Sequence, residues 1–351
     1  MDRKKILLIG PASPHLTNHY NRISKELFEI KVISNKRGFF EDDVNLVVLN
    51  FSLKQVSSFL LTPKKIASIH KEFHPDVIHI HQVNSYAYFG IRGLTKFKIP
   101  IIVTAWGSDI LINPKESSLL KHLVKYVLKR AQFLTSDSLY MADEMRKLVP
   151  KKKLDIEICN FGVKESDLSI INKQNLIYSN RTHNPLYNID KVIKTFNDFL
   201  KISEDKSWHL LIAGKGSETL SLKKLVIDLG ISDSVSFVGF LNEKQNLENY
   251  AKARFFISLP KSDATAMSLL EAMYYKCIPI VSDLPANREW VTNNENGIVL
   301  DEFCTENPIH SALSLNFEYA ENANHIKIKQ EGTIEVSEKK FNNLLLKAIN
   351  R

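Results

Sequence analysis

Apolar runs of strand length alternate with helix-like segments throughout the 351 residues, and this alternation predicts an α/β protein with parallel sheets. The runs form two sets of similar size, each of which fits one Rossmann-like half. A chain of this length is too long for one typical core and suits two domains. We therefore predict two Rossmann-like domains, 1–163 and 164–330, followed by a helical segment at 331–351.

The first half contains six predicted strands, each a short apolar run of the kind found in buried parallel sheets. They are Lys5–Gly10, Ile30–Ser34, Leu46–Leu49, Val77–His81, Ile101–Ala105 and Phe133–Ser136. A long amphipathic helix is expected at Lys115–Arg130. Near Ile158–Val163 a further strand gives way to a Gly turn, which marks the end of the first domain.

The second half repeats the pattern with six more predicted strands. They are Asn175–Ser179, His209–Ala213, Val235–Val238, Phe255–Leu259, Ile278–Ser282 and Gly297–Leu300. The final helix, with apolar positions at Leu344, Leu345, Leu346 and Ile349, could pack on either half. Its return to the first domain is the arrangement that we include in the predicted fold.

Composition narrows the function classes. Hydrophobic residues make up 44% and charged residues 25% of the chain, as in ordinary soluble proteins. No apolar run is long enough to span a bilayer, and the run before Gly10-Pro11 is too short for a signal peptide. The three cysteines have no metal-ligand spacing and indicate a reducing, cytoplasmic location. They are Cys159, Cys277 and Cys304.

The basic surplus lies in the first half. Residues 1–163 hold 25 Lys and Arg against 15 Asp and Glu, whereas the remainder holds 22 against 24. Lys121, Lys125 and Lys129 share one face of the expected helix, which suits anionic lipid headgroups. We therefore expect an anionic membrane surface as a partner of the first domain, on the inner face of the plasma membrane. A solvated basic face without a partner is the alternative.

The segment Ser262–Met273 has the clearest chemical pattern. Asp263 and Glu271 bracket a polar loop that follows an apolar run and leads into an amphipathic helix. The N-terminus of such a helix has unpaired N–H groups that suit a phosphate. A carboxylate farther along the helix can accept hydrogen bonds from sugar hydroxyls. Phosphate and hydroxyls together are the chemistry of a nucleotide sugar.

This pattern resembles glycosyltransferase family 4, a retaining family with the GT-B fold, which has a carboxylate, seven residues and then Glu at the same place. The segments Pro279–Asp283 and Arg288–Val291 also resemble one branch of that family. The resemblance covers nearly the whole chain and is strongest over Gly239–Val291. It implies two Rossmann-like domains facing across a cleft, with the donor mainly on the second domain and the acceptor on the first.

Position by position, the resemblance implies that Glu271 binds the ribose hydroxyls and that Asp263 contacts the transferred sugar. The donor's sugar and β-phosphate would lie against the backbone of a run that comprises Thr265, Ala266, Met267, Ser268 and Leu269. The alternative is that Asp263 only caps the helix and that Glu271 is solvated. The family usually has Glu at position 263 and Gly at position 266, so we expect a narrower sugar pocket here.

Arg181 follows the first strand of the second half and matches the arginine that reaches the diphosphate in this family. A lysine that the family commonly has nearby is replaced by Tyr187-Asn188. The turn that contains Gly214 and Gly216 would line the nucleotide site. Phe240 and Leu241 would run alongside the base. Each of these residues could instead have only a packing role.

On the acceptor side, the resemblance points to Gly10 and His15 in the first strand–helix loop. Trp106 stands where many relatives have His, so Asp109 is the remaining candidate to orient the acceptor hydroxyl. Capping the next segment is the alternative for Asp109. His79 and His81 share one face of a strand, but no third metal ligand is evident. We interpret them as polar residues of the core or the cleft, with His81 near the acceptor.

The sequence thus predicts transfer of a sugar from a nucleotide diphosphate sugar to a glycan or lipid-linked acceptor, in bacterial surface polysaccharide biosynthesis (capsule, O-antigen or lipopolysaccharide). The residues assigned to catalysis are Asp109, Arg181 and Asp263. No metal is required, because Arg181 and a helix N-terminus can stabilise the leaving diphosphate. A sugar-nucleotide epimerase and a non-catalytic scaffold are the alternatives. Nucleic acid is not expected as a partner, because no recognisable module interleaves basic and aromatic residues.

Overall fold

The computed structural model describes residues 3–166, 172–300 and 305–351. The chain divides into two compact units, which are described separately. Unit 1 comprises Met1–Phe161 and Ser337–Arg351, and unit 2 comprises Gly162–Val336. Cys304 lies outside the described residues, whereas Cys159 and Cys277 are buried free thiols. Within the described residues, no helix has the length and apolar character needed to cross a membrane.

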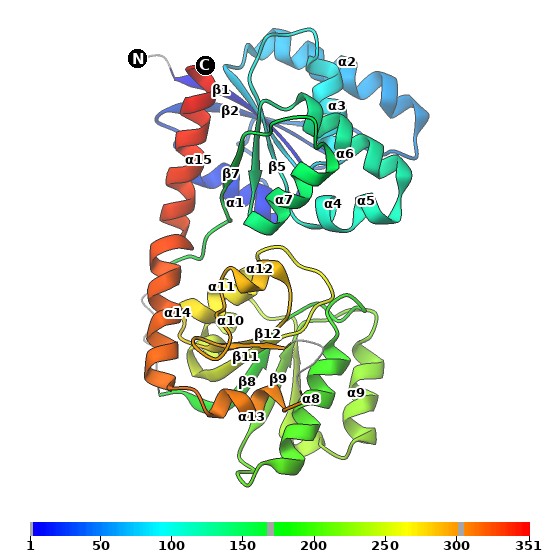
Figure 1. Ribbon diagram of the computed structural model, residues 1–351. Coiled ribbons are helices and arrows are strands. Elements are labelled where there is room, and N and C mark those ends of the chain that lie inside the picture. The colour runs from blue at the N-terminus through cyan, green and yellow to red at the C-terminus, as the bar shows by residue number, and fades with distance from the viewer. Residues whose placement is uncertain (1–2, 167–171, 301–304) are drawn as a thin grey trace. The chain divides into compact units, whose positions relative to one another are not determined.

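Unit 1 is built on a parallel sheet that has seven strands among the described residues, in the order β3-β2-β1-β4-β5-β6-β7 (Figure 1). The strands are β1 (Lys4–Ile9), β2 (Phe28–Ser34), β3 (Leu46–Val48), β4 (Val77–His81), β5 (Ile101–Thr104), β6 (Phe133–Ser136) and β7 (Ile156–Ile158). Six of them match the predicted set, and β7 is the further strand that was expected near Ile158–Val163. The segment at Ile156–Ile158 pairs with β6 as a short, half-buried edge strand.

Both faces of this sheet are covered, as expected for parallel strands. The helices of the unit are α1 (Pro14–Arg22), α2 (Val56–Phe73), α3 (Ser85–Leu94), α4 (Ser108–Leu111), α5 (Asn113–Glu116), α6 (Ser118–Arg130), α7 (Leu139–Leu148) and α15 (Ile334–Ile349). Ile6 and Leu8 of β1 share a core cluster with residues of α1 and α15. Leu344 and Leu345 of α15 are buried there, so the last helix completes the core of unit 1.

The predicted helix over Lys115–Arg130 is interrupted. Ser117 adopts extended backbone angles and its side chain accepts a hydrogen bond from the Leu120 N–H, which starts α6 at Ser118. The residues before it form the separate short helix α5. A serine at an N-cap position is the signal that marks this start.

Unit 2 contains a parallel sheet with six strands among the described residues, in the order β10-β9-β8-β11-β12-β13 (Figure 1). The strands are β8 (Gln174–Ser179), β9 (His209–Ala213), β10 (Val235–Gly239), β11 (Ala253–Ser258), β12 (Ile278–Ser282) and β13 (Ile298–Leu300). All six predicted strands are present. Together with unit 1, this confirms the predicted α/β class with two Rossmann-like sheets.

Two apolar clusters cover the two faces of the second sheet. The helical elements are α8 (Ile189–Ile202), α9 (Thr219–Asp228), η1 (Ser232–Ser234), α10 (Glu243–Lys252), α11 (Met267–Tyr274), α12 (Pro285–Arg288), α13 (Pro308–Leu313) and α14 (Phe317–Glu331). Phe255 packs in the cluster with α8 and α13, and its neighbour Phe256 packs in the cluster with α10 and α11. The alternation of these neighbours follows from the strand's two-residue period.

Each sheet changes winding direction beside its first strand. In unit 1, β1 lies between β2 and β4, and in unit 2, β8 lies between β9 and β11. Ligands of open parallel sheets bind outside the carboxyl ends of the strands at such a switch point. The site residues predicted from sequence follow these same strands.

Candidate functional site

The donor residues predicted in unit 2 come from three neighbouring strand ends. Arg181 follows β8, Gly214 follows β9, and Asp263 lies in the loop between β11 and α11. Because β9, β8 and β11 are adjacent and parallel, their following loops meet at one edge of the sheet. The sheet order therefore brings together residues that are far apart in sequence.

Arg181 is held in place by three side chains. One guanidinium nitrogen lies 2.6 Å from Asp263 Oδ2, and another donates to Ser268 Oγ at 3.0 Å. The ring of Tyr187 lies 4.3 Å from the guanidinium carbon, in cation–π contact. Burial is the largest single effect and lowers the pKa of Arg181, but Asp263 and Tyr187 together outweigh it and the net direction is upward. Arg181 is therefore a fixed, permanently charged group.

The Tyr187-Asn188 pair has a structural role in this loop. In the sequence, these residues stand where the family commonly has a lysine. In the structure Tyr187 stacks on Arg181, and Asn188 Nδ2 donates to the Leu259 carbonyl at 2.9 Å. The loop after β8 is thus tied to the end of β11. An aromatic residue six positions after an arginine is too common a pattern to predict this contact.

The glycines after β9 allow the loop of Arg181 to approach closely. Gly214 has a φ of +111°, and a Cβ there would lie 2.5 Å from the Arg181 carbonyl oxygen. A Cβ at Gly216 would collide with the backbone of His183. The Gly214 N–H donates to the Gly239 carbonyl at 2.7 Å, which extends the contact to β10. The predicted Gly turn therefore determines where Arg181 lies.

Gly214→Ala is expected to lower both the melting temperature and the affinity for UDP, because the added methyl group strains the backbone by about 1–3 kcal/mol and displaces the Arg181 loop. Gly230→Ala is a matched control, since Gly230 also has a positive φ, +70°, but nothing lies within 4 Å of its Cβ position. Thermal unfolding and calorimetric titration with UDP measure the two effects. Equal losses of UDP affinity in both variants would contradict this role of Gly214.

Helix α11 starts without a side-chain cap. Its N-cap is Ala266, whose side chain accepts no hydrogen bond from the first turn. Asp263 Oδ1 instead accepts from the Ala264 N–H at 3.1 Å, so the alternative that Asp263 caps the helix is wrong. The N–H groups of Met267 and Ser268, at the start of α11, lie next to Arg181 through the Ser268 contact, whereas the Leu269 N–H donates to the Ala266 carbonyl at 3.0 Å. Uncapped N–H groups and a guanidinium form an anion-binding arrangement.

Glu271 lies farther along α11 and is half-buried. Burial raises the pKa of Glu271 to about 7, and a hydrogen bond with Tyr250 opposes this shift. Tyr250 in turn accepts from Asn180 Nδ2 at 2.7 Å. Glu271 is therefore not an ordinary solvated side chain. Tyr250 and Asn180, which orient it, were not predicted because they come from α10 and the end of β8.

The remaining predicted donor residues have different environments. Phe240 follows β10 and its side chain is 82% exposed, whereas Leu241 packs against the core cluster of α10 and α11. Thr265 is buried and accepts from Trp290 Nε1 at 3.4 Å. The exposed Phe240 side chain is available to contact a ligand, whereas Leu241 has a packing role. Their contact with a base stays a prediction.

In unit 1, the predicted acceptor residues gather at the ends of β1, β4 and β5. A Cβ at Gly10 would lie 3.1 Å from His81 Cβ, so the glycine allows close approach. Trp106 Nε1 donates to His81 Nδ1 at 3.2 Å. The His15 ring lies 5.3 Å from the Trp106 ring, edge to face. Trp106, the residue that replaces a family histidine, thus contacts both predicted acceptor-side histidines.

Three buried histidines form a candidate metal site, and the structure supplies the third member that the sequence did not reveal. Nitrogen atoms of His19, His79 and His81 lie within 4.8 Å of one another. Burial lowers the pKa of all three, that of His79 to about 3, so the rings are neutral. Since Trp106 donates to His81 Nδ1, the neutral His81 ring carries its proton on Nε2. That nitrogen cannot then bind a metal, and these residues do not fit a three-histidine site.

Asp109 is buried and holds two backbone segments together. Its Oδ2 accepts from the Val83 N–H at 2.7 Å, and its Oδ1 accepts from the Trp106 N–H at 3.0 Å. The N-cap of α4 is Gly107, so the capping alternative for Asp109 is wrong. Burial raises the pKa of Asp109, and the backbone N–H groups oppose this shift. The carboxylate positions the turns after β4 and β5.

Asp109→Asn is expected to lower the melting temperature by breaking one of these contacts, at a cost of about 1–3 kcal/mol, and to reduce turnover. UDP affinity should be unchanged, because the donor residues lie in unit 2. Asp143→Asn, at an exposed position of α7, is the control. A variant that loses turnover at an unchanged melting temperature would instead support direct contact of Asp109 with the acceptor.

Two family models match the chain. One, described as glycosyl transferase 4-like, matches residues 5–138, and the other, described as glycosyl transferases group 1, matches residues 163–326. The chain belongs to the group 1 glycosyltransferases, family 4, with the GT-B fold. The predicted membership of the glycosyltransferase family is thereby confirmed.

Curated relatives are similar over part of their length. Alpha-monoglucosyldiacylglycerol synthase of Streptococcus pneumoniae is 26% identical over 60% of this chain and 52% of that protein. N-acetyl-alpha-D-glucosaminyl L-malate synthase of Bacillus anthracis is 23% identical over 65% of this chain and 64% of that protein. The chain thus matches about half to two thirds of the length of these relatives.

Solved structures share the fold. Alr3699/HepE of Anabaena in complex with UDP has a TM-score of 0.78 at 13% identity, covering 98% of this chain and 100% of that one. Sucrose-phosphate synthase of Thermosynechococcus elongatus has a TM-score of 0.78 at 14% identity, covering 98% and 99%. Identities this low establish the GT-B architecture alone.

Proposed function

We propose that this protein transfers a sugar, with retention, from a nucleotide diphosphate sugar to a hydroxyl group of a glycan or lipid-linked acceptor. The observation that carries the proposal is the fixed Arg181 beside the uncapped N-terminus of α11. Glu271 lies farther along the same helix, where a carboxylate can accept from ribose hydroxyls. Together these groups match a diphosphate and a ribose.

In the proposed reaction, the bond between the anomeric carbon and the diphosphate breaks through an oxocarbenium-like transition state. Negative charge builds up on the departing diphosphate. Arg181 and the N–H groups of α11 stabilise this charge, and their geometry is set before the donor binds. We propose that a metal is not required for this step. Asp263 keeps Arg181 in place and reaches toward the transferred sugar.

The proposed acceptor class draws on the printed names of the relatives. They include a glucosyldiacylglycerol synthase and an O-antigen chain mannosyltransferase. We propose a place in surface polysaccharide or glycolipid synthesis, at the inner face of the plasma membrane. Support for an anionic membrane surface comes from α6, where Lys121 and Lys129 are exposed and Lys125 is half-buried.

A thermal-shift screen tests the proposal, using UDP-glucose, UDP-galactose, UDP-N-acetylglucosamine and GDP-mannose. A ligand that binds the native state raises the melting temperature. We expect stabilisation by at least one donor and by its nucleoside diphosphate. No shift with any of them would favour the non-catalytic scaffold, and conversion of the donor sugar without an acceptor would favour the epimerase.

A further inference from the structure

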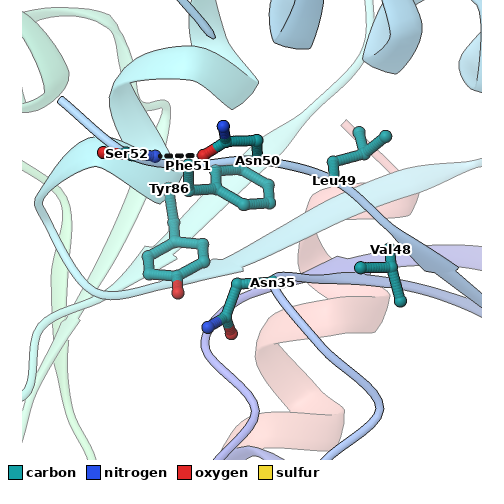
Figure 2. Close-up of a pocket in the computed structure, with 7 residues that line it drawn as sticks. All are labelled: Asn35, Val48, Leu49, Asn50, Phe51, Ser52 and Tyr86. Atoms are coloured by element: carbon teal, nitrogen blue, oxygen red, sulfur yellow. Dashed lines mark hydrogen bonds between the residues drawn. The ribbon is translucent and has the colours of Figure 1, made fainter. Parts of the chain in front are cut away.

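A pocket lies in unit 1, and its lining includes none of the clustered histidines. It has a volume of about 510 Å³ and opens beside the carboxyl ends of β2 and β3 (Figure 2). Its lining residues are Asn35, Val48, Leu49, Asn50, Phe51, Ser52 and Tyr86. Pockets of this volume are large enough for a small organic ligand.

The pocket is connected to the predicted acceptor side. Asn35 Oδ1 accepts from the Ala12 N–H at 3.0 Å, in the loop that follows β1. Tyr86 comes from the first turn of α3, directly after β4. His81 and Trp106 are not among the lining residues, although Tyr86 follows the strand that ends at His81.

The lining has the chemistry of a site for an uncharged polyol. None of its residues carries a charge, and the polar groups are two amides, a serine and a phenol. The rings of Phe51 and Tyr86 lie 4.4 Å apart and form a buried aromatic wall. Aromatic faces contact the C–H groups of a sugar ring, and amides and hydroxyls bind its hydroxyl groups. A phosphate or carboxylate would find no cation among these residues.

Two polar groups at the pocket have no partner within the part of the chain that the structure describes. They are the Tyr86 hydroxyl and Asn35 Nδ2, because Asn35 uses only its oxygen to bind Ala12. Figure 2 shows both groups on the same side of the pocket. Asn50, in contrast, is occupied, since its oxygen accepts from the Ser52 N–H at 2.9 Å. The pocket thus presents two donor groups to a ligand, the Tyr86 hydroxyl and the Asn35 amide nitrogen.

We propose that this pocket binds a neutral pyranose unit of the acceptor glycan, beyond the sugar that receives the new bond. The assignment of the bound sugar to the acceptor rests on the proposed transferase function. Binding of a sugar by the pocket does not depend on that function. Because none of the predicted acceptor-side residues, such as His81, Trp106 and Asp109, lines the pocket, we assign its occupant to a unit other than the reacting sugar. The pocket would therefore select acceptors that contain more than one sugar.

Saturation-transfer NMR on the full chain with saturating UDP tests this binding, with the methyl α-glycosides of glucose, galactose, mannose and N-acetylglucosamine as probes. We expect saturation of at least one glycoside. Tyr86→Phe and Asn35→Asp should each reduce it about fivefold, since each removes one donated hydrogen bond and Asp keeps the acceptor for Ala12. Tyr88→Phe, on the same helix but outside the pocket lining, should leave it unchanged.

The outcomes separate this proposal from the proposed function. If none of the four glycosides receives saturation, or if the variants and wild type give equal saturation, the proposal that the pocket binds a sugar would be overturned. Saturation of 1-hexanol in place of the glycosides would also overturn it and assign the pocket to an acyl chain. Calorimetric titration of UDP into the same proteins, prepared without nucleotide, reports on the donor site independently. Loss of UDP binding with retained, Tyr86-dependent saturation would refute the transferase proposal alone.

Discussion

Glu271→Ala is expected to weaken binding of the donor's nucleoside diphosphate about 100-fold or more. A ribose offers two hydroxyl groups, and each hydrogen bond to a charged acceptor contributes about 1.5–3 kcal/mol. The fold should remain intact, because Tyr250 keeps its hydrogen bond from Asn180. Calorimetric titration of UDP and GDP into wild type and variant measures the effect.

Glu295→Ala is the control, since Glu295 is exposed in the loop before β13. It should bind the nucleotide like wild type. Equal affinities for wild type and Glu271→Ala would remove Glu271 from the donor site.

Glu271 also predicts a pH dependence of stability. Burial raises its pKa from 4.5 to about 7, so between these values the folded state binds more protons than the unfolded state. The stability from this group is present below the unfolded pKa and is lost as pH rises through about 7. Glu271→Gln, which stays neutral, should therefore unfold at a higher temperature than wild type at pH 8 and at a similar temperature at pH 5.

Arg181→Met is expected to lower turnover about 100- to 1,000-fold, because it removes a preorganised donor to the leaving group. It should also destabilise the fold by about 3 kcal/mol, because it leaves Asp263 unpaired. The two side chains are only 10% and 19% exposed, so water screens the pair weakly. Thermal unfolding and a transfer assay measure the two losses separately.

The double variant Arg181→Met/Asp263→Asn separates structure from chemistry. It should recover most of the melting temperature, since no unpaired charge remains, but none of the turnover. Arg288→Met is the control, because its partner Asp283 and Arg288 itself are 35% and 50% exposed and such pairs contribute about 0–1 kcal/mol. Turnover in the double variant would exclude a catalytic role for Arg181.

Much of the fold could be predicted because buried parallel strands are continuous apolar runs. His209–Ala213 and Ile278–Ser282 were predicted with the bounds that β9 and β12 have. The edge strand β7 was expected only without bounds, near Ile158–Val163, since three half-buried residues leave little apolar signal. The break before α6 depends on one serine, which a helical pattern alone does not reveal.

The site was predictable only where its residues belong to one local unit. The Asp263–Glu271 spacing could be recognised in the sequence, because loop and helix are contiguous. The ion pair of Arg181 and Asp263 joins residues 82 positions apart and depends on the order of the strands. His19 and Tyr86 likewise reach their sites through helix packing and follow no motif.

The position of α15 affects how this protein folds during its synthesis. Leu344, Leu345 and Ala348 complete the core around β1, although the ribosome synthesises these residues more than 300 positions later. Unit 2 is continuous in sequence from Gly162 to Val336 and has no such dependence. Domains usually fold in order from the N-terminus during synthesis. Here that order is reversed at the last step, since the first unit to leave the ribosome is the last to close its core.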